Sequence, residues 1–216
     1  MLEKGQKTGF SRDDGAGRSP GAPRGRATPD RPRLTAAAGA HYILASTQRM
    51  QRHHCFEAGS VVCDLRSTDK FDALRELIHR APIFARRSVP ADIEAAVVAR
   101  ELQQCTGFGH GIAVAHGRVN GLAQVLIALG ISRGGISYDS PDGEPVRLLA
   151  VIASPPNLSL DYLQALSTLV RCLREPEDRD ALIHGATARE VEERIRTAFL
   201  AELDRFEEPL RRGSAG

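Results

Sequence analysis

From about residue 56 onwards, apolar residues recur at spacings that predict alternating strands and helices. A short apolar run at 61–65 is typical of a strand, and the apolar positions 71, 74, 77 and 78 give one face of a helix. A second helix is predicted to begin near Ser88 and Pro90, because proline favours the first helical position. Further strands are predicted at 112–116, 125–129 and 146–152. The last is a nearly continuous apolar run, which indicates a strand buried on both faces.

The C-terminal third has helical spacing. A leucine-rich face runs from Leu160 to Leu173, and a short helix around 181–183 is predicted to end at Gly185. Thr187 and Glu190 have the spacing of a capping box ahead of a third helix, whose apolar face continues to 203. Strands interleaved with helices predict a single α/β domain, placed at residues 55–205, with a flexible C-terminal tail at 206–216.

Residues 1–54 have a different composition. They contain ten Lys or Arg against four acidic residues, so their charge is +6, while the rest of the chain carries −4. The first 40 residues hold seven Gly and four Pro and no periodic apolar pattern, which predicts a disordered basic tail. Acidic residues interrupt the basic ones and no aromatics interleave with them, so a solvated tail is favoured over a nucleic-acid-binding arm. Met50, just before the regular pattern, is an alternative translation start.

Several classes of protein are disfavoured by the sequence. No window approaches the roughly 18 apolar residues of a membrane span, and no apolar stretch follows the first lysines as in a secretory signal. The four cysteines are far apart, which favours free thiols and a cytoplasmic protein. The run 53–55, His-His-Cys, lacks a second group of metal ligands, so neither a metal nor another cofactor is expected.

The stretch from Arg100 to Arg118 carries the most informative chemistry. Glycines at 107, 109 and 111 allow backbone N–H groups to approach an anion closely. His116 follows at the end of a predicted strand, where its neutral imidazole could act as a nucleophile. Arg100 and the loop N–H groups could then support a phosphorylated ring. These residues alone leave open a purely structural role for His116.

The same stretch resembles the signature of type-2 enzyme IIA domains. It reads Arg100-Glu101, then Cys-Thr-Gly-Phe-Gly-His-Gly-Ile-Ala-Val-Ala-His-Gly-Arg over 105–118. Those domains are the fructose/mannitol-type and nitrogen-regulatory phosphocarriers of the bacterial phosphotransferase system. Segments at 61–78, 139–152 and 162–173 resemble further parts of the family in the same order, so the resemblance covers roughly residues 56–203.

The resemblance implies a fold and a site. The fold would be a mixed β-sheet covered by helices on both faces. The family histidine that accepts a phosphoryl group from a phosphorylated HPr-type carrier falls on His116, and the supporting arginine falls on Arg100. Neighbours of the phosphate are then expected among Thr106, Gly109, His110, Gly111 and Tyr162.

Three positions depart from the family pattern. Ala115 replaces the usual proline before the active histidine, which frees a backbone N–H and relaxes φ. His110 stands where the family commonly has Asn, and it could donate to phosphate or merely replace the amide. Tyr162 falls on a second family histidine, and a phenol cannot become cationic as imidazole can.

Three functions follow from this reading. The favoured one is a regulatory, nitrogen-regulatory-like enzyme IIA that carries phosphate on His116. The alternatives are a non-enzymatic protein-binding module with impaired phosphorylation and a soluble sugar-specific enzyme IIA that serves a separate permease. The expected partners are an HPr-type carrier and a regulated protein or permease; neither membrane insertion nor nucleic-acid binding is expected.

Overall fold

The computed structural model describes residues 55–213, with side chains through Arg205. The basic tail predicted at 1–54, including the His53-His54 pair, lies outside the described residues. In chain order, the elements are β1 (Val61–Val62), α2 (Lys70–Arg80), α3 (Pro82–Arg87), α4 (Pro90–Gln103), β2 (Gly107–Gly109), β3 (Ile112–Arg118), β4 (Leu126–Ile136), β5 (Val146–Ser154), α5 (Ser159–Cys172), α6 (Pro176–Ile183) and α7 (Ala188–Gly213).

The five strands form one mixed sheet in the order β1-β4-β5-β3-β2. β5 lies at its centre, antiparallel to β4 and parallel to β3. The edge strands are short: β1 pairs parallel with β4, and β2 pairs antiparallel with the start of β3. The mixed sheet expected from the family resemblance is therefore confirmed.

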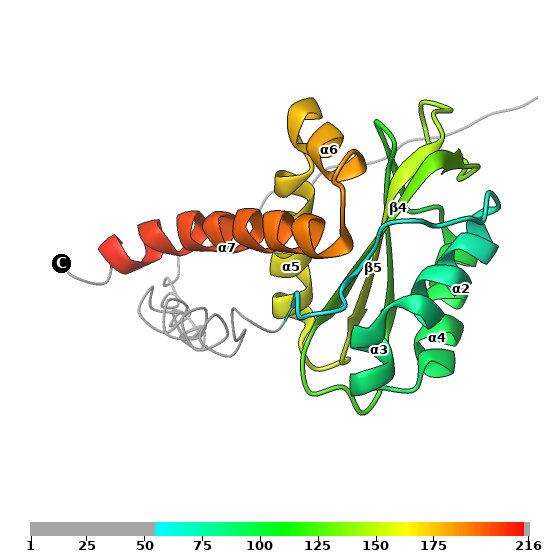
Figure 1. Cartoon of the computed structure of the whole chain (residues 1–216). Coiled ribbons are helices and arrows are strands. Elements are labelled where there is room, and N and C mark those ends of the chain that lie inside the picture. The colour runs from blue at the N-terminus through cyan, green and yellow to red at the C-terminus, as the bar shows by residue number, and fades with distance from the viewer. Residues whose placement is uncertain (1–54, 214–216) are drawn as a thin grey trace, which may run out of the picture. The chain divides into compact units, whose positions relative to one another are not determined.

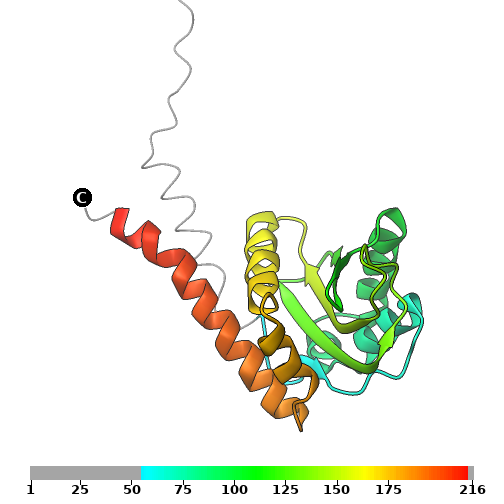
Figure 2. The ribbon, with the colours of Figure 1, turned by 90° about the horizontal axis from the view of Figure 1, so that it is seen from above.

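Helices cover both faces of this sheet (Figures 1 and 2). α2, α3 and α4 lie on one face, and α5, α6 and α7 lie on the other. Successive side chains of a strand point to opposite faces. In β5, Leu148, Ala150 and Ile152 accordingly join the core under α5 and α7, while Leu149, Val151 and Ala153 join the core under α2 and α4. Burial on both faces explains the continuous apolar run of this strand, as the sequence predicted.

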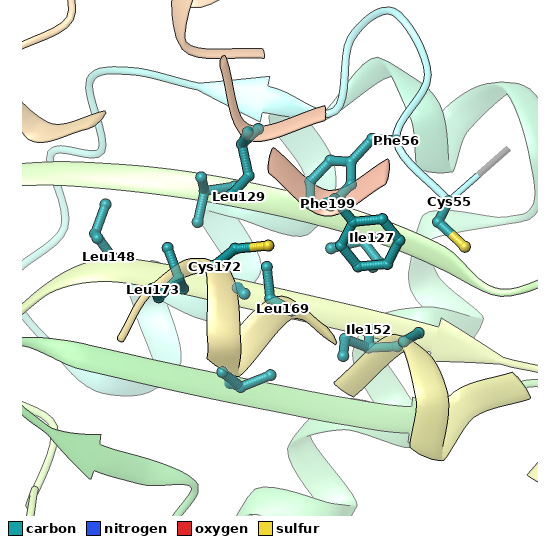
Figure 3. Packing of buried hydrophobic residues seen from close by; sticks show 14 of the residues in the cluster. Cys55, Phe56, Ile127, Leu129, Leu148, Ile152, Leu169, Cys172, Leu173 and Phe199 are labelled. Carbon is teal, nitrogen blue, oxygen red and sulfur yellow. The ribbon is translucent and has the colours of Figure 1, made fainter. Parts of the chain in front are cut away.

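The core on the α5 and α7 side contains a pair of aromatic rings. The rings of Phe56 and Phe199 meet edge to face, with centroids 5.2 Å apart, and Figure 3 shows them beside Ile127. Cys55 and Cys172 are buried in the same cluster, and all four cysteines of the chain are free thiols. α7 contributes a stripe at four-residue spacing, Val191, Ile195, Phe199 and Leu203, all buried.

Side-chain caps and a turn fix the ends of several elements. The Asp69 carboxylate accepts hydrogen bonds from the N–H groups of Phe71 and Asp72 at the start of α2. Thr187 Oγ1 accepts from the Glu190 N–H at 3.2 Å, half of the predicted capping box. The turn at 140–143 closes with a 2.9 Å bond from the Gly143 N–H to the Ser140 carbonyl.

Four elements differ from the sequence-based prediction. α3 and β2 were not predicted, and β4 extends well past 129. α7 continues to Gly213, beyond position 205 where the domain is predicted to end. Among the described residues, no helix combines the length and the apolar character that crossing a membrane requires.

Candidate functional site

Close packing of α4 on β3 brings Arg100 to the strand that carries His116. Gly117 makes this approach possible, because a Cβ atom at this position would lie 2.9 Å from both Ala96 Cβ and Val97 N. Contacts this short do not occur with real Cβ atoms, so only glycine fits. The C-terminal end of α4, and Arg100 with it, therefore sits beside the end of β3.

Arg100, Thr106 and His116 line one pocket of about 190 Å³. The loop after α4 and Leu166 of α5 complete its wall, as does Phe108, which is 49% exposed. Arg100 Nη1 donates to the Gln104 carbonyl at 3.0 Å, so the helix end tethers the guanidinium beside the pocket that Arg100 lines. The structure thus brings together three of the residues that the sequence singled out.

A buried carboxylate fixes the loop that carries Thr106. Glu101 Oε1 accepts the Thr106 N–H at 3.1 Å, and Glu101 Oε2 accepts the Thr106 hydroxyl at 2.5 Å. The Tyr138 hydroxyl lies 3.2 Å from the same Thr106 oxygen, and Lys70 Nζ lies 3.8 Å from Glu101 Oε1. Charge-assisted hydrogen bonds in a buried setting are strong, so this clamp makes the α4–β2 connection a rigid wall of the pocket.

Tyr162 flanks His116 from α5. The two ring centroids are 5.2 Å apart with planes tilted by 39°, and Tyr162 is buried. Arg118 lies over the same Tyr162 ring, its Cζ 4.5 Å from the ring centroid. Burial raises the pKa of the Tyr162 phenol, so the side chain stays neutral near neutral pH.

Gly109, His110 and Gly111 do not reach this pocket. They form the tight turn between β2 and β3, in which all three residues have positive φ. His116 lies four residues along the strand from Ile112, about 13 Å farther on. The His110 N–H donates to Asp142 at 2.6 Å, and its side chain lines a separate hollow with Arg147 and Arg179. The glycine spacing therefore serves a hairpin here and not a cradle around His116.

His116 is half-buried and has an electropositive surrounding. Burial lowers its pKa below the ordinary histidine value, and the nearby Arg100 guanidinium lowers it further, as does Arg118. The Val114 carbonyl and the Glu101 carboxylate act in the opposite direction but do not reverse the shift. Nδ1 is buried without a hydrogen-bond partner of normal geometry among the described residues, so Nε2 is the nitrogen left for the pocket.

The pKa of His116 is expected to lie below the ordinary value of about 6.5 when it is measured by NMR titration. A lowered pKa means that the neutral, nucleophilic ring persists to lower pH than in a free histidine. Replacing Arg100 with glutamine removes a positive charge and should raise the midpoint. A midpoint at or above 6.5 in the unmodified protein would contradict the burial and charge described above.

Sequence reasoning assigned no role to Glu101, Cys105 or Arg118. Cys105 lines the pocket and donates from Sγ to the Tyr138 carbonyl at 3.1 Å. Strand alternation could have found Arg118, because residues two apart in a strand share a face, and His116 and Arg118 are two apart. Within the part of the chain that the structure describes, no group of three His, Cys, Asp or Glu side chains is placed to hold a metal ion.

Comparison with known proteins gives a consistent result. The family model described as "Phosphoenolpyruvate-dependent sugar phosphotransferase system, EIIA 2" matches residues 54–198. The fructose-specific EIIABC component of Bacillus subtilis is 29% identical over 126 residues, which are 58% of this chain and 20% of that protein. A nitrogen regulatory protein of Pseudomonas aeruginosa is 35% identical over 92 residues, 43% of this chain and 60% of that protein. The aligned regions thus span less than two thirds of either relative.

A solved structure agrees with the sequence comparisons. The crystal structure of nitrogen regulatory protein IIA-Ntr from Neisseria meningitidis superposes with a TM-score of 0.59 at 27% identity. The superposition covers 65% of this chain and 96% of that one. The resemblance noted in the sequence is therefore confirmed for both the sequence family and the fold.

Proposed function

Because the chain belongs to the EIIA 2 family of the phosphoenolpyruvate-dependent sugar phosphotransferase system, we propose that His116 accepts a phosphoryl group from the phosphohistidine of an HPr-type carrier protein. The observation that carries the proposal is the shared pocket of His116 and Arg100. A nucleophilic ring nitrogen and a fixed guanidinium are the minimum that phosphoryl transfer between two imidazoles requires. A protein that receives its phosphoryl group from an HPr-type carrier would act in the cytoplasm.

The transfer needs positioning and charge more than proton chemistry. The Nε2 lone pair of His116 would form the new N–P bond while the N–P bond of the donor breaks and its electron pair returns to the donor imidazole. Each ring keeps its other N–H, so no net proton is transferred. The lowered pKa of His116 keeps Nε2 unprotonated near neutral pH, and Arg100 would stabilise the charge on the equatorial oxygens.

Thr106 would shape the wall of the phosphate site and not donate to the phosphate. Its hydroxyl and its backbone N–H both donate to Glu101. Thr106 and Gly107 form one segment of the pocket lining. The clamp described above would keep this segment from moving during transfer, which is the kind of pre-organisation that phosphoryl transfer rewards.

For the downstream role we favour the nitrogen-regulatory branch over sugar transport. The nitrogen regulatory protein of Pseudomonas aeruginosa and the IIA-Ntr structure support this choice, whereas the Bacillus subtilis fructose component supports the alternative. On the regulatory reading the phosphate should remain on His116 when a fructose-type EIIB domain is added. Rapid transfer to that domain would instead favour a soluble sugar-specific component.

Intact-mass measurement after incubation with enzyme I, an HPr-type carrier and phosphoenolpyruvate tests the acceptor role. We expect one added phosphoryl group on the unmodified protein, none on His116→Ala, and one on His110→Ala. His110 is the matched control because it belongs to the same motif but faces the separate hollow. Absence of phosphate on the unmodified protein, while a known enzyme IIA is labelled in parallel, would reject the carrier role and favour a protein-binding module.

A further inference from the structure

We infer that Arg118 is a second phosphate-supporting group of this site and that the Tyr162 ring is the platform that positions its guanidinium next to His116. The inference rests on the proposed function and deepens it, because it adds a cationic group that the family signature does not assign. It is carried by the contacts that the Tyr162 ring makes with the His116 ring and with the Arg118 guanidinium.

The backbone places Arg118 on the correct side of the sheet. His116 and Arg118 are two residues apart in β3, so both side chains leave the same face, with Cα atoms about 7 Å apart. β3 is paired with β5 along its whole length, from Ile112 opposite Leu148 to Arg118 opposite Ser154. This ladder fixes the relative direction of the two side chains.

The guanidinium of Arg118 is held although the residue is exposed. Its Cζ lies 4.5 Å from the Tyr162 ring centroid, well within the range of cation–π attraction. Arg118 Nη1 also donates to Ser154 Oγ at 3.2 Å and to the Pro155 carbonyl at 3.3 Å. An arginine makes five N–H donors available, so a single nitrogen engaged in this way leaves others for an anion.

Tyr162 connects the two groups. Its ring lies 5.2 Å from the His116 ring and is buried, so it cannot rotate freely away from either neighbour. Because burial keeps the phenol protonated, Tyr162 adds no negative charge that would offset Arg118. A phosphoryl group on Nε2 would then have Arg100 on the α4 side and Arg118 on the α5 side.

The electrostatics of the unmodified site agree with this geometry. Arg100 and Arg118 both lower the pKa of His116, so the field of each guanidinium reaches the ring. The Glu101 carboxylate acts on the ring in the opposite direction, and it is occupied by Thr106. Two cations near a neutral imidazole are unfavourable for protonating it, and they are favourable for placing a dianionic phosphoryl group on it.

Chemical phosphorylation with phosphoramidate tests Arg118 without any carrier protein. In this reaction the Nε2–P bond forms, the P–N bond of phosphoramidate breaks and ammonia leaves. The variants are Arg118→Gln, which removes the charge, and Arg118→Lys, which keeps it without the planar fork. Arg147→Gln is the matched control, because Arg147 is an exposed strand arginine that lines the separate hollow.

Loss of one cationic contact should slow phosphorylation of Arg118→Gln, or shorten the lifetime of its phosphohistidine, about 5-fold or more. Arg118→Lys should fall between Arg118→Gln and the unmodified protein, and Arg147→Gln should match the unmodified protein. Tyr162→Leu, which lacks the platform, should be impaired more than Tyr162→Phe, which keeps it. The pKa of His116, measured by NMR on unphosphorylated samples, should rise in Arg118→Gln and stay unchanged in Arg147→Gln.

The inference is overturned if Arg118→Gln equals Arg147→Gln in rate, lifetime and His116 pKa. It is also overturned if phosphoramidate does not label His116 in the unmodified, folded protein. The proposed function fails differently: phosphoramidate would label His116, Arg118→Gln would still be impaired, and only the HPr-type carrier would give no transfer.

Discussion

Replacing Arg100 with glutamine is expected to slow phosphoryl transfer to His116 about 100-fold, the usual effect of removing one charged donor from a transition state. Arg100 lines the His116 pocket and is tethered to the Gln104 carbonyl, so its guanidinium is held in place before the phosphoryl group arrives. Arg100→Lys should recover only part of the rate, because an ammonium cannot reproduce the bidentate fork. Rapid-quench kinetics of transfer from a phosphorylated HPr-type carrier would measure these rates.

The control for Arg100 is Arg86→Gln. Arg86 lies in the last turn of α3 and also donates to a backbone carbonyl, that of Pro82, but it is not among the residues that line the pocket. Its replacement should leave the transfer rate unchanged. Equal rates for Arg100→Gln and Arg86→Gln, with His116 phosphorylated in both, would show that the Arg100 guanidinium does not take part in transfer.

Replacing Gly117 with alanine is expected to lower both stability and transfer rate. The new Cβ would lie 2.9 Å from Ala96 Cβ and Val97 N, and the helix backbone cannot yield as a flexible side chain can. Overpacking of this kind costs about 1–3 kcal/mol of unfolding free energy. Because α4 also carries Arg100, its displacement by about 1 Å could reduce transfer as much as 100-fold.

Gly134→Ala provides the comparison for Gly117→Ala. Gly134 also lies in a strand, β4, but a Cβ atom there would have no neighbour within 4 Å. Urea unfolding should place Gly134→Ala close to the unmodified protein and Gly117→Ala clearly below it. A Gly117→Ala protein with unchanged stability and unchanged transfer would contradict the close helix–strand contact that positions the site.

The sequence predicted the elements with strong periodicity and missed the short ones. α3 is a six-residue helix that follows α2 after the single residue Ala81, too short for its own apolar face to be recognised. β2 contains two glycines in three residues, which oppose strand formation locally. It exists because it pairs with β3 at the edge of the sheet, a contact that no local pattern reveals.

The sequence predicted those site residues that belong to a single motif and meet in one pocket. Arg100, Thr106 and His116 are close in sequence, and one helix, one loop and one strand bring them to the same pocket. His110 belongs to the same motif, but the β2–β3 turn carries it to the opposite end of β3. Residues that are close in sequence are also close in space within a helix turn. Along an extended strand the same number of residues spans a much longer distance.

The Arg118–Tyr162 stack could not be predicted from local pattern. Arg118 lies on β3, its hydrogen-bond acceptor Pro155 follows β5, and Tyr162 lies on α5. The contact between Arg118 and Tyr162 therefore depends on the order of the strands in the sheet. The replacement of the family's second histidine by Tyr162 is visible in the sequence as the loss of a titratable group. Only the structure shows a cation resting on the ring that replaces it.

Nitrogen-15 NMR of the carrier-phosphorylated protein, labelled at histidine, tests the central claim most directly. The chain has seven histidines, and each ring nitrogen reports separately on attached phosphorus. The expected result is phosphorylation of a single histidine, His116, at Nε2, because its Nδ1 is buried. Phosphate on a different histidine, on Nδ1 of His116, or on no histidine while a known enzyme IIA is labelled would contradict it.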